Sequence, residues 1–121
     1  MIEYLIGNII TYYSNYYVRL PNGEIMKKFV YPAVIYYDED ALVYVMHIED
    51  LGIVVEGDTV EEAHKRAGQF MDIYLETAFK EELDIPEATE FDKMVSAHPK
   101  EMVVLIESTL NDKNKAIKVD K

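Results

Sequence analysis

The feature that most constrains the fold is one amphipathic segment that runs from Thr59 to Glu82. Thr59 and Glu62 have the spacing of a capping box, and acidic residues in a first turn suit the positive end of the helix dipole. Apolar residues then recur at helical period on one face: Val60, Ala63, Ala67, Phe70, Met71, Tyr74 and Ala78. The pattern predicts one helix of roughly 36 Å. Its small residues Ala63, Ala67 and Gly68 would allow close approach to a sheet.

Four segments around this helix are typical of β-strands, because they are rich in Val, Ile, Tyr and Phe. They are Phe29–Tyr37, Leu42–Ile48, Ile53–Val55 and Met102–Glu107. The first two flank the polar tip of a predicted hairpin, and Pro32 suits a strand beginning or a sheet edge. Residues 88–100 are predicted as a loop with a helical turn. The expected fold class is α+β: a small, mostly antiparallel sheet in the order β-β-β-α-β, with one long helix on one face.

The first 25 residues have a different pattern. They are rich in Ile and Tyr at near-helical spacing, yet these residue types favour strands, so the pattern leaves both structures open. Leu20-Pro21-Asn22-Gly23 predicts a turn. We therefore divide the chain into residues 1–25, an N-terminal extension of undetermined structure, and residues 26–121, one domain.

The charge of the chain is strongly one-sided. Lys and Arg number 12 against 23 Asp and Glu, which gives a formal net charge of −11. Such a chain is a poor binder of nucleic acid, because that binding depends on cationic side chains that displace counterions. A basic protein partner is favoured, since opposite potentials speed encounter, although acidity that serves only solubility explains the charge equally well.

The sequence contains no cysteine, which excludes disulfides, thiolate metal sites and cysteine nucleophiles. No apolar run approaches the length of a membrane span. Glu3 stands where a signal peptide carries basic residues, and no small-residue cleavage pattern follows. We expect a cytoplasmic protein without a membrane partner.

Candidate catalytic groups are few. Carboxylates that could hold metal ions as in a nuclease are Asp38, Glu39, Asp40, Glu49 and Asp50, but a solvated hairpin tip and a turn explain them better. The histidines His47, His64 and His98 lie far apart in different predicted elements, without metal-site spacing. Nucleophile-elbow and phosphate-loop motifs are missing. We expect no catalytic residue, no metal, no cofactor and no enzyme activity.

Several short motifs carry more information together than each does alone. Tyr31-Pro32-Ala33-Val34-Ile35 resembles the opening strand of HicB-type antitoxins, and Gly57-Asp58-Thr59-Val60-Glu61-Glu62-Ala63 resembles the helix-opening signature of that family. Ile85-Pro86 after the helix also matches. Glu49-Asp50-Leu51-Gly52 departs from the family pattern, because a proline is missing and Ile53 replaces the usual cysteine, but Gly52 keeps the turn. The resemblance covers about residues 26–107.

The resemblance implies a fold and a partner. The fold is a partly degraded RNase H-like domain, and the role is the antitoxin of a HicAB-type system. Such an antitoxin binds and occludes HicA, a small basic mRNA-cleaving toxin, at its catalytic histidine surface. We predict toxin contacts on the helix at Glu61, Glu62, Asp72 and Glu76, although an ordinary solvated face also explains these charges. Edge strands in so small a sheet favour a homo-oligomer.

Two departures from the family affect the expected function. Many members continue into a DNA-binding module, but residues 108–121 are too short for one, so no direct DNA binding is expected. Gly23-Glu24 can be encoded by GGAGAA, a purine-rich sequence typical of a ribosome-binding site, just before the Met26 codon. We hypothesise that residues 1–25 are translated from leader sequence. If they are genuine, their aromatic side chains must be buried on the domain or on a second subunit.

Two alternatives stay open from the sequence. The chain could be a solo HicB-like protein with an unknown partner, or a vestigial RNase H-like nuclease. A neighbouring reading frame that encodes a short basic protein with a lone histidine favours the antitoxin.

Overall fold

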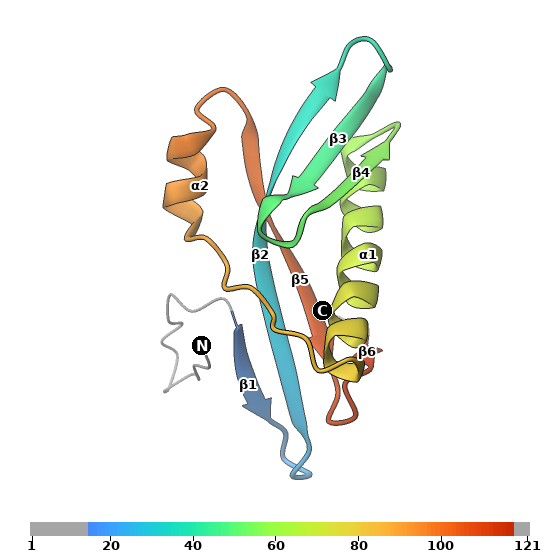
Figure 1. The fold of residues 1–121 in the computed structure, drawn as a ribbon, viewed down its shortest axis with the longest axis vertical. Helices are drawn as coiled ribbons and strands as arrows, with labels where there is room; N and C mark the ends of the chain where they lie inside the picture. Colours follow the sequence, from blue (N-terminus) through green and yellow to red (C-terminus); the bar gives the residue numbers. More distant parts are fainter. Residues whose placement is uncertain (1–14, 118–121) are drawn as a thin grey trace.

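A computed structural model describes residues 15–117 of the chain (Figure 1). It confirms the α+β class, with an antiparallel sheet, one long helix and one short helix. The elements in order are β1 (Asn15–Arg19), β2 (Ile25–Asp38), β3 (Val43–Ile48), the 3-10 turn η1 (Glu49–Leu51), β4 (Ile53–Gly57), α1 (Val60–Lys80), α2 (Phe91–Ala97), β5 (Met102–Leu110) and β6 (Ala116–Ile117). The predicted order of three strands, helix and strand corresponds to β2, β3, β4, α1 and β5.

The long strand β2 organises the sheet. The strand order is β4-β3-β2-β5-β6, and β1 also pairs with β2. On one edge, β2 pairs with β5 from Lys27 to Ile35. On the other edge, β1 pairs with residues 25–29 and β3 with residues 34–38.

Part of the segment that the sequence left open, residues 15–19, belongs to the same sheet as the domain. The predicted turn after it is confirmed, because the Gly23 N–H donates a hydrogen bond to the Leu20 carbonyl oxygen at 2.9 Å. Residues 1–14 lie outside the described residues, so for them the choice between helix and strand stays open.

The prediction that Pro32 lies at a strand beginning or a sheet edge is wrong, because Pro32 lies inside the central strand. The pairings with β1 and β3 leave a gap at residues 30–33 on that edge of β2. A proline, which lacks an N–H donor, is tolerated in a strand where the pairing is interrupted. The linker between α1 and α2 passes this gap, where the Tyr31 hydroxyl donates a hydrogen bond to the Pro86 carbonyl oxygen at 2.6 Å.

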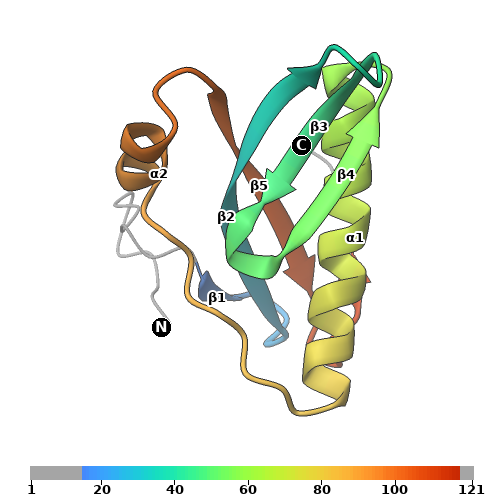
Figure 2. The same cartoon turned by 45° about the horizontal axis from the view of Figure 1, so that its top comes forward.

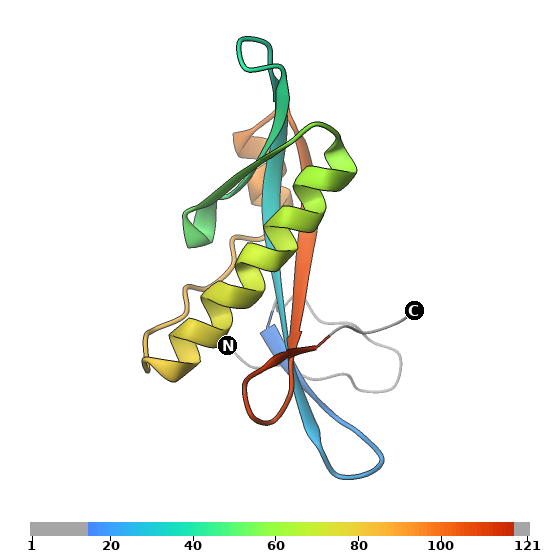
Figure 3. The ribbon, with the colours of Figure 1, turned by 90° about the vertical axis from the view of Figure 1, so that its right-hand side faces the viewer.

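The core lies between α1 and one face of the sheet. Successive strand residues point to opposite faces, so the odd-numbered residues of β2 share one face. Phe29, Tyr31, Ala33 and Ile35 lie there and join a buried cluster with Met71 and Leu75 of α1. Full burial of one such large apolar side chain stabilises the fold by about 1.5–3 kcal/mol. Figure 3 shows α1 crossing the sheet diagonally.

The start of α1 confirms the capping-box prediction. The Thr59 side chain accepts a hydrogen bond from the Glu62 N–H at 3.0 Å, and the Glu62 carboxylate accepts one from the Asp58 N–H at 3.3 Å. The first bond satisfies a backbone donor that a helix start leaves free, and the second ties the Glu62 carboxylate to the residue before the N-cap. The helix therefore begins directly after β4.

Small residues bring α1 close to β4, as predicted for Ala63 and Ala67, which are fully buried. A Cβ atom on Gly57, at the end of β4, would stand 2.5 Å from the Ala63 backbone nitrogen. A Cβ atom on Gly68, by contrast, would have no heavy atom of a neighbouring element within 4 Å, so the predicted role of Gly68 in this approach is wrong.

The predicted apolar stripe of α1 is correct only in part. Its buried residues are Ala63, Ala67, Met71, Leu75 and Ala78. Phe70 is 52 % exposed and Ile73 is 60 % exposed. The sequence pattern placed Phe70 in the core and missed Leu75. The helix is rotated about its axis relative to the predicted orientation, so Leu75 is buried and Phe70 is exposed.

Two glycine substitutions test the close approach. Gly57→Ala should lower the free energy of unfolding by about 1–3 kcal/mol, because the new methyl group collides with helix backbone. Gly68→Ala is the matched control and should raise it by up to about 1 kcal/mol, because alanine favours the helix interior. Urea denaturation measures both. Equal effects of the two substitutions would contradict the packing described.

Candidate functional site

The four helix carboxylates predicted to contact a toxin do not form one patch. Glu61 is exposed, whereas Glu62 caps α1 and pairs with Arg66, their side-chain atoms lying 3.1 Å apart. Glu62 and Glu76 are separated by roughly 21 Å along the helix axis. Glu61 and Glu62 therefore lie in the first turn of α1, Asp72 near its middle and Glu76 near its end.

Asp72 and Glu76 bind the strands that follow the helix. The Ser108 hydroxyl of β5 donates a hydrogen bond to Asp72 at 2.6 Å, and the Ala116 N–H of β6 donates one to Glu76 at 2.6 Å. Burial raises the pKa of Asp72, Ser108 acts in the opposite direction, and the nearby Glu76 charge raises it further. Both carboxylates are half-buried, and both connect α1 to the C-terminal part of the sheet.

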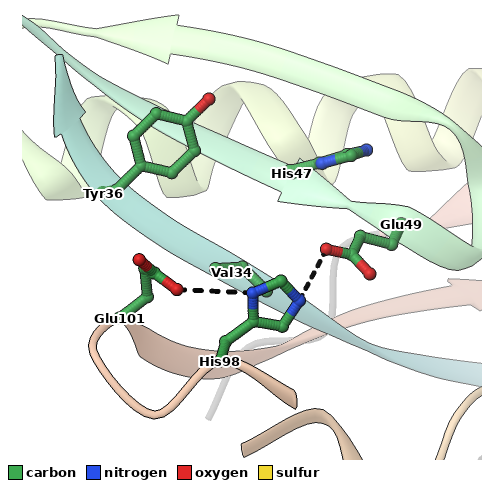
Figure 4. A pocket seen from close by; sticks show the side chains of 6 residues that line it. All are labelled: Val34, Tyr36, His47, Glu49, His98 and Glu101. Carbon is green, nitrogen blue, oxygen red and sulfur yellow. Dashed lines mark ion pairs between the residues drawn. The ribbon is translucent and has the colours of Figure 1, made fainter.

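A pocket of about 310 Å³ lies on the face of the sheet opposite α1, which we call the open face. Val34 and Tyr36 of β2 and His47 of β3 line its floor and wall. Glu49 of η1, His98 after α2 and Glu101 before β5 complete it. Figure 4 shows these side chains in front of the sheet, with α1 behind it.

His98 lies between two carboxylates in this pocket. Its Nε2 atom is 2.7 Å from a Glu49 carboxylate oxygen, and its Nδ1 atom is 3.3 Å from a Glu101 carboxylate oxygen. These contacts use one oxygen of each carboxylate.

The structure corrects one expectation about histidines. His47 and His98 come from different elements, as predicted, but α2 brings them into the same pocket. His64 lies elsewhere, exposed on the first turns of α1. No sequence pattern predicts that His47 and His98 lie close together, because their proximity depends on where α2 packs.

The carboxylates considered for a nuclease have other contacts. Asp38 accepts hydrogen bonds from the N–H groups of Asp40 and Ala41 in the hairpin turn. Asp50 accepts from the Thr89 N–H at 2.8 Å and from the Thr89 hydroxyl at 2.7 Å, which fixes the linker to η1. Within residues 15–117, no group of three or more His, Asp or Glu side chains has an arrangement that could hold a metal ion.

Among the places where large apolar side chains are exposed, two lie on the outer sides of the helix and sheet layers. The first is the outer side of α1, with Phe70 and Ile73. The second is the open face, with Tyr36, Val54 and Leu105, which are between 45 and 53 % exposed. Exposed apolar side chains that cluster on a surface are typical of binding sites.

Comparison of the chain with family models, with curated proteins and with solved structures finds no match in any of the three. In the described part of the chain, neither helix has the length and apolar character needed to cross a membrane.

The raised pKa of Asp72 predicts a pH-dependent stability difference. A carboxyl whose pKa is raised by folding stabilises the fold below its unfolded-state pKa, and this contribution is lost as the pH rises through the folded-state pKa. Asp72→Asn, which keeps an acceptor for Ser108, should therefore have a higher Tm than the wild type at pH 7. The gain should vanish near pH 3. Thermal denaturation across this range measures it, with Asp40→Asn at the exposed hairpin tip as control. A lower Tm for Asp72→Asn at pH 7 would contradict the assigned burial effect.

Proposed function

We propose that this protein is an antitoxin of the HicAB type, which binds a small basic mRNA-cleaving toxin and occludes its active surface. The observation that carries the proposal is the combination of a net charge of −11 with large apolar side chains exposed on the open face. Apolar anchors provide affinity at a protein interface, and opposite charge raises the association rate. The motifs around Tyr31 and Thr59 resemble those of HicB-type antitoxins. This resemblance is the basis for proposing a HicA-type partner.

The fold arrangement is in keeping with this proposal. Three antiparallel strands are followed by a long helix, and the next strand returns beside the first of the three and antiparallel to it. We propose that this is a degraded RNase H-like domain that has kept the sheet and lost the chemistry. Asp38 accepts a hydrogen bond within the hairpin turn, and Asp50 accepts one from the linker. These structural contacts favour a binding function over a catalytic one.

Further parts of the proposal concern location and assembly. We place the protein in the cytoplasm, where it acts without direct contact to DNA, because an acidic surface repels phosphates. We also propose a homo-oligomer. β4 is an end strand of the sheet order, and an outer strand edge with unpaired backbone groups favours pairing with a second copy.

Co-expression tests the proposed function. The protein should restore growth to cells that express a HicA-type toxin, its proposed partner, and the two should co-purify. The control is the same toxin with its lone histidine replaced, which should still co-purify without affecting growth. Toxicity that persists with no complex formed would refute the antitoxin function and favour a solo protein. Metal-dependent RNA cleavage by the pure protein, abolished by EDTA, would favour the vestigial nuclease.

A further inference from the structure

The open face forms a continuous surface around the pocket. In the strand register, Val54 of β4 lies opposite His47 of β3, and His47 lies opposite Val34 of β2. Side chains of directly paired residues are neighbours on a sheet face. Val54, which is exposed, therefore extends the wall that His47 and Tyr36 provide to the pocket. Figure 2 shows β3 and β4 side by side at this end of the sheet, with α2 beyond β2.

Apart from Tyr36, the ionisable residues that line the pocket are two carboxylates and two histidines. Glu49 and Glu101 line it, and none of its lining residues among the described part of the chain is Lys or Arg. Each carboxylate has two oxygens with about four acceptor sites, and the contacts with His98 use one oxygen of each. The pocket thus combines unused acceptors with the flat ring faces of Tyr36 and His47. Guanidinium groups bind carboxylates in a planar fork and stack on aromatic rings.

We propose that the surface formed by Tyr36, His47, Glu49, Val54 and Glu101, here called the docking surface, binds a basic protein partner through an arginine that enters the pocket. The arginine guanidinium would bind Glu49 and Glu101 and stack on Tyr36, while Val54 covers apolar atoms at the rim. This inference rests on the proposed function for the kind of partner, and it adds the surface and the anchoring chemistry.

Charge decides between this surface and the outer side of α1. Phe70 and Ile73 are exposed there, and the charges around them have both signs. Arg66 pairs with Glu62, Glu76 follows Ile73 by three residues and Lys80 follows it by seven. Residues at such spacings share one helix face. A basic partner would meet mixed charge beside these apolar side chains, whereas the docking surface has two carboxylates and no Lys or Arg.

A peptide titration tests the pocket without any toxin. The probe is acetyl-Gly-Arg-Gly-amide, and the control is the same peptide with citrulline, which has nearly the same shape but no charge. Amide resonances of Glu49, His98 and Glu101 should shift on addition of the arginine peptide to the full chain, and those of Glu61 should not. The citrulline peptide should leave all four unchanged. Equal shifts with both peptides, or no shift with either, would overturn the proposal.

Paired variants test the surface in the complex. Glu49→Gln with Glu101→Gln keeps the shape of the pocket and removes two charges, and should weaken binding of the inactive toxin by about tenfold or more. The matched control, Glu61→Gln with Glu81→Gln at the two ends of α1, makes the same charge change and should weaken toxin binding less than about twofold.

Tyr36→Leu, at an exposed position, gives an independent readout if the first variant fails to fold, and should also weaken binding. A greater loss for the α1 pair, or for Phe70→Ser, would place the interface on α1 and overturn the proposal.

The two tests separate the two claims. Arginine-peptide binding without a toxin complex would refute the antitoxin function and leave the pocket chemistry standing. A toxin complex that both Glu pairs leave unaffected would support the antitoxin function and refute the docking surface.

Discussion

The close contact between the end of β4 and the first turn of α1 positions the rest of the molecule. Gly57 has no side chain, so the backbone of Ala63 can approach it at a distance that a Cβ atom would forbid. The capping bonds of Thr59 and Glu62 start the helix directly after this contact. α1 is therefore laid over the odd-numbered face of β2, where it buries Met71 and Leu75. The opposite face keeps the pocket and the exposed Tyr36 and Val54.

This geometry also explains why the acidic helix is a poor guide to the interface. Asp72 and Glu76 bind Ser108 and the Ala116 backbone, and Glu62 caps the helix, so three of the four predicted contact residues have structural partners. The outer side of α1 instead combines Phe70 and Ile73 with charges of both signs, among them Arg66, Glu76 and Lys80. Glu49 and Glu101 also contact their own chain, through His98, but each uses one carboxylate oxygen there and both line an open pocket. The net charge of the sequence is thus one basis for the proposed kind of partner, but it does not identify the surface.

The sequence predicted the parts of the fold that depend on local pattern. The capping spacing of Thr59, the strand runs and the helical period were enough for the class and the order of the main elements. Hydrophobicity could not determine the rotation of α1, because Phe70 and Leu75 are both apolar, whereas the observed orientation also involves tertiary contacts with Gly57, Ser108 and Ala116. The pocket was not predictable either. Glu49 and His98 are separated by the whole of α1 and α2, and they meet because the linker bound to Tyr31 and Asp50 leads α2 to the open face.

The open face, and not α1, is the surface that we propose binds a basic protein. Hydrogen exchange measured by mass spectrometry on a complex with the proposed HicA-type toxin tests this most directly, because exchange reports protection along the whole backbone. We expect added protection in residues 43–57 and 98–101, with the outer turns of α1 from Arg66 to Lys80 unchanged. Protection confined to α1, with the open-face segments exchanging as in the free protein, would contradict this assignment.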